Sequence, residues 1–203
     1  MVEFFVNGGA FMWPILAILI VGLAFVGERL YHLVRALSTK YEFALSLSKQ
    51  IEDDGFDAAK KTCEDAVGPI ANLCYNALEV ADKGPEVAEK TLNQTAGIEM
   101  AALEKNMTWI SLCIATAPML GFLGTIAGMI VAFADIAAAE NISPKIVADG
   151  IGQALYTTAF GLVVAVIIQF GQNTVMFIID NLIVTIQKST TVVLQSISKK
   201  HNK

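Results

Sequence analysis

The sequence predicts an all-α membrane protein with three transmembrane helices and two long helices that extend into a helical cytoplasmic region. Composition is the first observation, because 55% of the 203 residues are hydrophobic and only 16% are charged. The second is that three segments lack Asp, Glu, Lys and Arg, namely 4–27, 106–134 and 150–179. Each exceeds the roughly 20 residues that a helix needs to cross about 30 Å of hydrocarbon. A soluble protein would need far more chain to bury three such helices.

The first apolar segment is expected to remain in the protein as a span. It is preceded by Glu3 instead of a basic region, and Glu28 and Arg29 follow where a signal peptide would carry small residues for cleavage. Lysine or arginine follows the first and third segments and precedes the second, whereas the N-terminus has neither. By the positive-inside rule the N-terminus is outside, and the central region and C-terminal tail are cytoplasmic.

These rules divide the chain into six parts. The predicted boundaries are a periplasmic N-terminus with the first span over 1–27, a helical cytoplasmic region over 28–108, the second span over 109–134, a short periplasmic loop over 135–150, the third span over 151–180 and a cytoplasmic helical tail over 181–203. Turn residues separate three short helices in the cytoplasmic region. Ser38 is a candidate N-cap of the first, which ends at Gly55. The second runs over 56–66, and the third carries an apolar face from Ile70 toward Gly84–Pro85.

Two features extend helices beyond the spans. Pro85 suits a first helical position, and the absence of a strong breaker before Pro118 predicts one helix over 86–134. After Asp180, an apolar stripe continues at helical spacing through Leu182, Ile183, Ile186, Val193 and Ile197. Because this stripe would otherwise be exposed to water, neighbouring copies or the small cytoplasmic helices must cover it.

Ridges of small residues on the second and third spans predict close helix packing. The first ridge has spacing i, i+4, i+7 and i+11 and consists of Ala117, Gly121, Gly124 and Gly128. The comparable strip on the third span consists of Ala154, Thr158, Gly161, Ala165 and Gln169. Small side chains let helix backbones approach each other where lipid provides no hydrophobic drive.

Hydroxyl groups of Thr125, Thr157 and Thr158 lie at these ridges, and two interpretations of them stay open. They either bond the carbonyls of their own helices, or a ring of them from several copies supports a chain of water or solvates a cation. The span interiors contain no Asp, Glu, Lys, Arg or His. If protons cross, a partner must therefore supply the titrating carboxylate.

Other classes of function are not favoured. A net charge of −5 argues against nucleic acid as a partner. The chain has no HExxH motif, no Gly-rich phosphate loop and no intramembrane Ser–His pair, so neither an enzyme nor a bound cofactor or metal is expected. Cys63, Cys74 and Cys113 form no CxxC pair and are interpreted as reduced packing residues.

Four stretches of the chain together resemble a known family. They are "GGAFMWPILAILIVGLAFVGERLYHL", "GFDAAKKTCEDAVGPIANL", "APMLGFLGTIAGMIVAF" and "VADGIGQALYTTAFGLVVAV". Their order and spacing resemble the ExbB/TolQ branch of the ExbB/TolQ/MotA ion-channel subunits. The resemblance implies a homopentamer in the bacterial inner membrane, with two copies of an ExbD/TolR-like single-span partner in its pore. That partner would contribute a membrane aspartate, and proton motive force would drive work, with a TonB- or TolA-like protein as a further partner.

The resemblance also assigns individual residues. Thr125 and Thr158 match the family's pore threonines, and Pro118 and Gly124 match the framework around the former. Gln153 stands where ExbB has a glutamate, and an amide cannot exchange a proton at neutral pH. The transported ion is still expected to be the proton, and this departure makes sodium the alternative. A non-conducting helical scaffold is the rival interpretation.

Overall fold

The computed structural model describes residues 5, 7–37, 41–138 and 144–201, and these form helices and turns without a strand. The α-helices are α2 (Met12–Ala36), α3 (Tyr41–Asp53), α4 (Phe56–Glu64), α5 (Pro69–Glu79), α6 (Pro85–Leu103), α7 (Met107–Ala138) and α8 (Pro144–His201), and a short 3-10 helix, η1, covers Ala81–Lys83. Three helical stretches are long and apolar enough to cross a membrane, and they lie within Met12–Asp53, Pro85–Ala138 and Ala148–His201. The predictions of an all-α chain and of three spans are thereby confirmed.

The chain forms two compact units. One consists of Met1–Glu28 and Asn106–Thr174, and we call it the apolar unit. The other consists of Arg29–Lys105 and Val175–Lys203, and we call it the polar unit. Both units contain parts of α2 and α8, whereas α7 belongs to the apolar unit alone and α3 to α6 to the polar unit alone.

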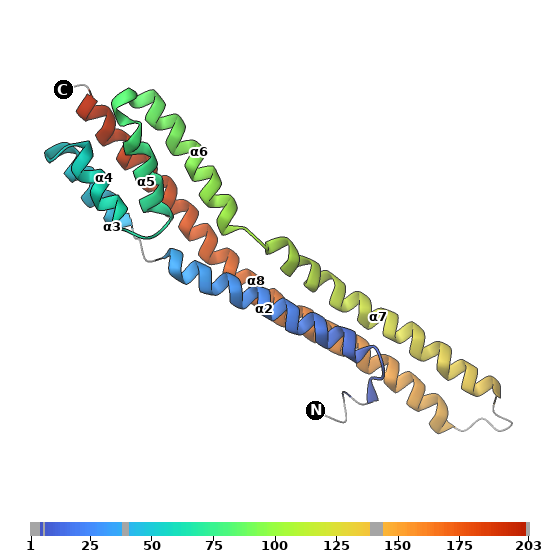
Figure 1. The fold of residues 1–203 in the computed structure, drawn as a ribbon. Coiled ribbons are helices and arrows are strands. Elements are labelled where there is room, and N and C mark those ends of the chain that lie inside the picture. Colours follow the sequence, from blue (N-terminus) through green and yellow to red (C-terminus); the bar gives the residue numbers. More distant parts are fainter. Residues whose placement is uncertain (1–4, 6, 38–40, 139–143, 202–203) are drawn as a thin grey trace. The chain divides into compact units, whose positions relative to one another are not determined.

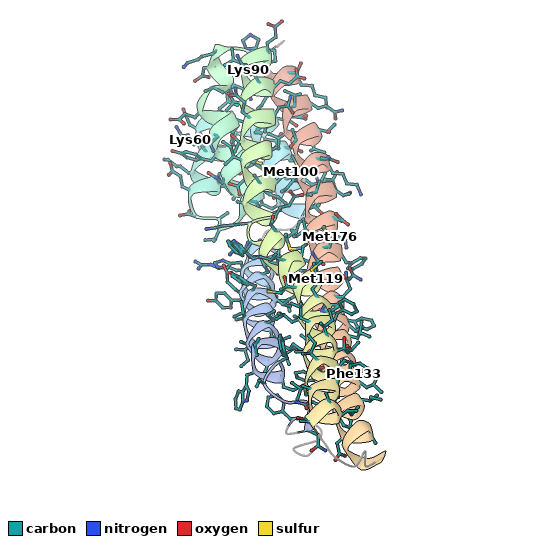
Figure 2. The ribbon with its side chains drawn as sticks, turned by 90° about the vertical axis from the view of Figure 1, so that its right-hand side faces the viewer. Lys60, Lys90, Met100, Met119, Phe133 and Met176 are labelled. Atoms are coloured by element: carbon teal, nitrogen blue, oxygen red, sulfur yellow. The ribbon has the colours of Figure 1, made fainter. Side chains whose placement is uncertain are left out.

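Three helical segments lie side by side in the apolar unit (Figure 1). Gly22 of α2 packs on Ile168 of α8, so closely that a Cβ atom at Gly22 would lie 2.5 Å from Ile168 Cδ1. The large apolar side chains of α7 include exposed ones, among them Met119 and Phe133 (Figure 2), which are 65% and 63% exposed. An exposed apolar surface of this extent suits lipid, as expected for spans.

The polar unit follows the predicted turn signals. Gly55 ends α3 with φ +92°, and Gly84 precedes α6 with φ +109°, both in the region that favours glycine. Pro69 and Pro85 begin α5 and α6, as expected of proline in the first helical turn. The third helix is shorter than predicted, because α5 ends at Glu79 and η1 fills the interval before Gly84. The proposed cap at Ser38 lies outside the described residues.

The end of α8 is covered by helices of the same chain. Ile186, Val193 and Ile197 are fully buried, and Figure 1 shows α3 to α6 gathered beside this part of α8. Lys199 Nζ lies 3.1 Å from Glu52 Oε1 and ties α8 to the end of α3. The sequence analysis expected either neighbouring copies or the small cytoplasmic helices to cover this apolar stripe. Within the single chain, the small helices cover it.

The cysteines are free and buried, which confirms their interpretation as packing residues. Burial raises the pKa of the Cys63 thiol to about 12, and the nearby Glu64 carboxylate adds to this shift. Burial also raises the pKa of the Cys74 thiol well above its usual range. Because the reactive form of cysteine is the thiolate, these two residues are inert at neutral pH.

The prediction of one helix over 86–134 is wrong, because the helix is interrupted between Leu103 and Met107. Asn106 adopts φ +65° and is the one described non-glycine residue with a positive φ. Asparagine tolerates this left-handed conformation better than most residues. Its side-chain Nδ2 donates a hydrogen bond of 2.9 Å to Glu28 Oε2 in the second half of α2. The break is therefore fixed by a contact with a distant part of the chain.

Replacing Asn106 should test this account of the break. Asn106→Ala is expected to destabilise the protein by about 1–2 kcal/mol, because alanine is strained at this φ and the bond to Glu28 is lost. Asn106→Gly removes the same bond but relieves the strain, so it should be the milder change. Thermal unfolding of both variants in detergent measures the difference. A glycine variant less stable than the alanine variant would contradict the backbone argument.

Candidate functional site

The contact between α7 and α8 is made by backbone atoms and small side chains. Ala117, Gly121, Gly124 and Gly128 are all buried on one face of α7, as the ridge predicted. A Cβ atom at Gly121 would lie 3.1 Å from Thr158 Cα, and one at Gly161 would lie 2.6 Å from the Ala117 carbonyl oxygen. A methyl group would overlap the facing backbone at Gly161 and would be tight at Gly121, so the two helices approach closely through their backbones.

Thr157 fills the space above Gly124. It is only 1% exposed, and a Cβ atom at Gly124 would lie 2.7 Å from both Thr157 Cβ and Thr157 Oγ1. The Thr157 hydroxyl donates a hydrogen bond of 2.8 Å to the Ala154 carbonyl of its own helix. In the single chain this threonine is a packing residue whose polar group is satisfied locally.

Thr158 and Thr125 have partly exposed hydroxyl groups. Thr158 Oγ1 donates 3.0 Å across the helix contact to the Gly121 carbonyl, whereas Thr125 Oγ1 donates 2.6 Å to Phe122 of its own helix. Because each hydroxyl group donates its proton to a carbonyl, only the lone pairs of its oxygen remain free to interact with another group. Such oxygens accept bonds from water or coordinate a cation, and they do not favour an anion.

Pro118 lies inside α7, one helical turn from this contact. Proline has no N–H group, so the Ile114 carbonyl one turn earlier lacks its usual helical donor. The family resemblance assigns Pro118 and Gly124 to a framework, and along α7 they lie one turn on either side of Gly121, to which Thr158 donates.

Gln153 lies in the wall of a hollow at the other end of the α7–α8 contact. The hollow has a volume of about 650 Å³, and its polar lining residues are Asn7, Asp135, Asp149, Gln153 and Tyr156. Its lining includes no basic side chain among the described residues. With two carboxylates and no cation in the lining, the hollow attracts positive charge.

The turn before α2 packs against this glutamine. Gly9 has φ +72°, and a Cβ atom there would overlap the Gln153 side-chain amide. Sequence analysis identified Gln153 but not the turn beside it. The adjacent Gly8 and Gly9 were the available signal, because paired glycines mark positions where the backbone turns or approaches another group.

The fold and this contact define a helical membrane protein whose spans pack through glycines and place neutral hydroxyls beside their interface. The chain belongs to the MotA/TolQ/ExbB proton channel family, whose model matches residues 65–188.

Individual relatives agree with this assignment. The chain is 28% identical over 168 residues to a putative biopolymer transport protein ExbB homolog of Methanothermobacter thermautotrophicus, an alignment covering 82% of this chain and 59% of the relative. It is 30% identical to the putative biopolymer transport protein ExbB-like 1 of Synechocystis over 80% of this chain and 65% of the relative. The Tol-Pal system protein TolQ of Haemophilus influenzae is 29% identical over 69% of this chain and 56% of the relative. The chain thus spans about three fifths of the length of these curated relatives.

Proposed function

We propose that this chain is an ExbB/TolQ-like subunit of an ion-driven motor in the bacterial inner membrane. Five copies surround a pore that holds two copies of an ExbD/TolR-like single-span partner, and the N-terminus is periplasmic. Proton motive force is converted into work on the periplasm or outer membrane, through a TonB- or TolA-like protein. The observation that carries the proposal is that Thr158 and Thr125, both partly exposed, place neutral hydroxyl oxygens in spans whose interiors contain no Asp, Glu, Lys, Arg or His.

The proposed mechanism is electrostatic. A partner aspartate that enters the pore is costly when ionised, but less so where water bridges it to the oxygens of Thr125 and Thr158. A proton arriving from the periplasm neutralises the aspartate, and the partner helix then turns toward an apolar wall. Release of the proton on the cytoplasmic side restores the charge. One charge crossing 100 mV supplies about 2.3 kcal/mol, so work accumulates over repeated steps.

The acidic hollow supports an entry route on the periplasmic side. Asp135 and Asp149 would raise the local concentration of cations at the outer end of the spans. Gln153 cannot exchange a proton at neutral pH, but its amide can hydrogen-bond water, and its side-chain carbonyl oxygen can coordinate a sodium ion. This glutamine is the observation that favours a sodium-driven motor as the second candidate. The hydroxyls of Thr125 and Thr157 that bond their own helices favour the third, a non-conducting scaffold.

Ion flux into sealed vesicles tests the proposal. Vesicles would contain this protein alone or together with its co-purified single-span partner, under either a pH gradient or a sodium gradient. We expect flux of one ion that requires the partner, because only the partner brings the titrating acid. Native mass measurement of the same complex should give five copies to two. A complex that assembles with its partner and passes neither ion would leave the scaffold as the correct account.

A further inference from the structure

A second group of polar side chains lies in the apolar unit, and the mechanism above does not use it. Ser111 of α7 and Gln169, Gln172 and Asn173 of α8 form this group, which we call the inner amide cluster. Gln172 Nε2 donates 2.6 Å to Ser111 Oγ and so joins the two helices. Gln169 Nε2 donates 3.0 Å to Asn173 Oδ1 and 3.4 Å to Gln172 Oε1.

Helix packing alone does not account for this cluster. The bond between Gln172 and Ser111 is sufficient to join α7 to α8, yet Gln169 adds an amide that reaches only its own helix. Both bonds use Gln169 Nε2, so within the described part of the chain the Gln169 Oε1 atom has no hydrogen-bond partner. An amide group facing lipid with an unused polar atom is unfavourable, so this face must meet water or protein.

The cluster lies on the same side of α8 as the pore threonine. With 3.6 residues per turn, Gln169 and Asn173 lie within an arc of about 60° from Thr158. At 1.5 Å per residue, they are about 16 and 22 Å further along the helix. On α7, Ser111 lies within about 40° of Thr125 by the same arithmetic. The two threonines and the cluster therefore follow one edge of the α7–α8 pair.

The interval between them also contains a polar group. The Ile114 carbonyl, which Pro118 deprives of its helical donor, lies on α7 between Thr125 and Ser111. Hydroxyl, carbonyl and amide oxygens thus succeed one another along the edge, and all of them are neutral. Neutral oxygens bind a cation or its water without holding it as tightly as a carboxylate would, which permits release.

We propose that the inner amide cluster is a binding site on the ion path, on the cytoplasmic side of the pore threonines. It receives a hydrated monovalent cation, or the water that carries a proton, after the pore threonines and before the cytoplasm. Gln169 supplies the free polar atom, and Gln172 positions the site through Ser111. This inference rests on the proposed function and extends it to the inner half of the membrane.

The test uses the protein in vesicles with its single-span partner. Gln169→Leu and the double variant with Gln172→Leu should slow flux per assembled complex by about tenfold, which corresponds to about 1.4 kcal/mol in the barrier. The matched control is Thr174→Val on the same helix, whose hydroxyl donates 2.9 Å to Phe170 and should be dispensable. Parallel pH and sodium gradients show which cation uses the site. If the double variant fails to assemble, Gln169→Leu decides alone, because it preserves the bond between Gln172 and Ser111.

A purely structural role predicts a different pattern. Ser111→Ala breaks the bond between the helices but leaves both glutamines in place. If the cluster were only a clamp, Ser111→Ala and the double variant would lose thermal stability together, with normal flux per complex. Normal flux in an assembled Gln169→Leu complex would overturn the inference while the proposed function stood. A wild-type complex without flux would overturn both.

Discussion

Gly161→Val is expected to prevent α7 and α8 from packing and to leave little folded protein. A Cβ atom at this position would lie 2.6 Å from the Ala117 carbonyl oxygen and 3.2 Å from Gly121 Cα. Both obstacles are backbone atoms of the facing helix, so no rotamer change relieves the overlap. The helices must separate, which also breaks the bond from Thr158 to Gly121. Overpacking of this kind costs about 3 kcal/mol or more.

Gly27→Val is the matched control for this experiment. Gly27 lies in α2, and apart from its two neighbours and the adjacent backbone of its own helix, no described atom lies within 4 Å of a Cβ atom built there. Both substitutions add the same β-branched side chain to an apolar helix, so propensity and hydrophobicity are balanced between them. Yield and thermal stability in detergent should fall for Gly161→Val and stay near wild type for Gly27→Val. Equal losses would show that valine in a span, and not the helix contact, is responsible.

Local patterns predicted most of the fold. The absence of charge marks the three spans, the glycine spacing marks the α7 ridge, and Gly55 and Gly84 mark turns. Each of these signals is contained within a few residues of the element that it specifies. Burial of the ridge against another helix follows from the same pattern, because small residues on one helical face let two backbones approach closely in lipid.

The features of the fold and the site that the sequence did not predict depend on contacts between residues or helices that local patterns do not specify. The break at Asn106 depends on a hydrogen bond to a residue 78 positions away, and asparagine within a helical pattern is a weak breaker by itself. The turn at Gly9 is recognisable only with Gln153 beside it. The directions of the threonine hydroxyls were equally hidden, since Thr158 bonds the facing helix while Thr125 and Thr157 bond their own.

Thr158→Val is expected to abolish ion-driven work while the complex still assembles. Valine has nearly the same shape as threonine, and the lost bond to the Gly121 carbonyl costs only about 1 kcal/mol. The proposed ion path would lose the one hydroxyl oxygen that α8 places against the Gly121 carbonyl, and the remaining Thr125 hydroxyl lies on the other helix. Flux with the partner present should fall by about a hundredfold or more, as for a barrier raised by about 3 kcal/mol.

Thr116→Val provides the control for removing a hydroxyl from a span. Thr116 donates 2.6 Å to the Leu112 carbonyl within α7, on a face away from Gly121, so its loss should leave flux unchanged. Thr158→Ser completes the set, because it restores the oxygen without the methyl group. If the oxygen matters, serine recovers flux and valine does not; if only the shape of the contact matters, valine retains flux and serine, which leaves a void, loses it. Thr158→Ser should therefore carry more flux than Thr158→Val if the oxygen matters, and less if only the shape matters. Vesicle flux per assembled complex distinguishes the two roles.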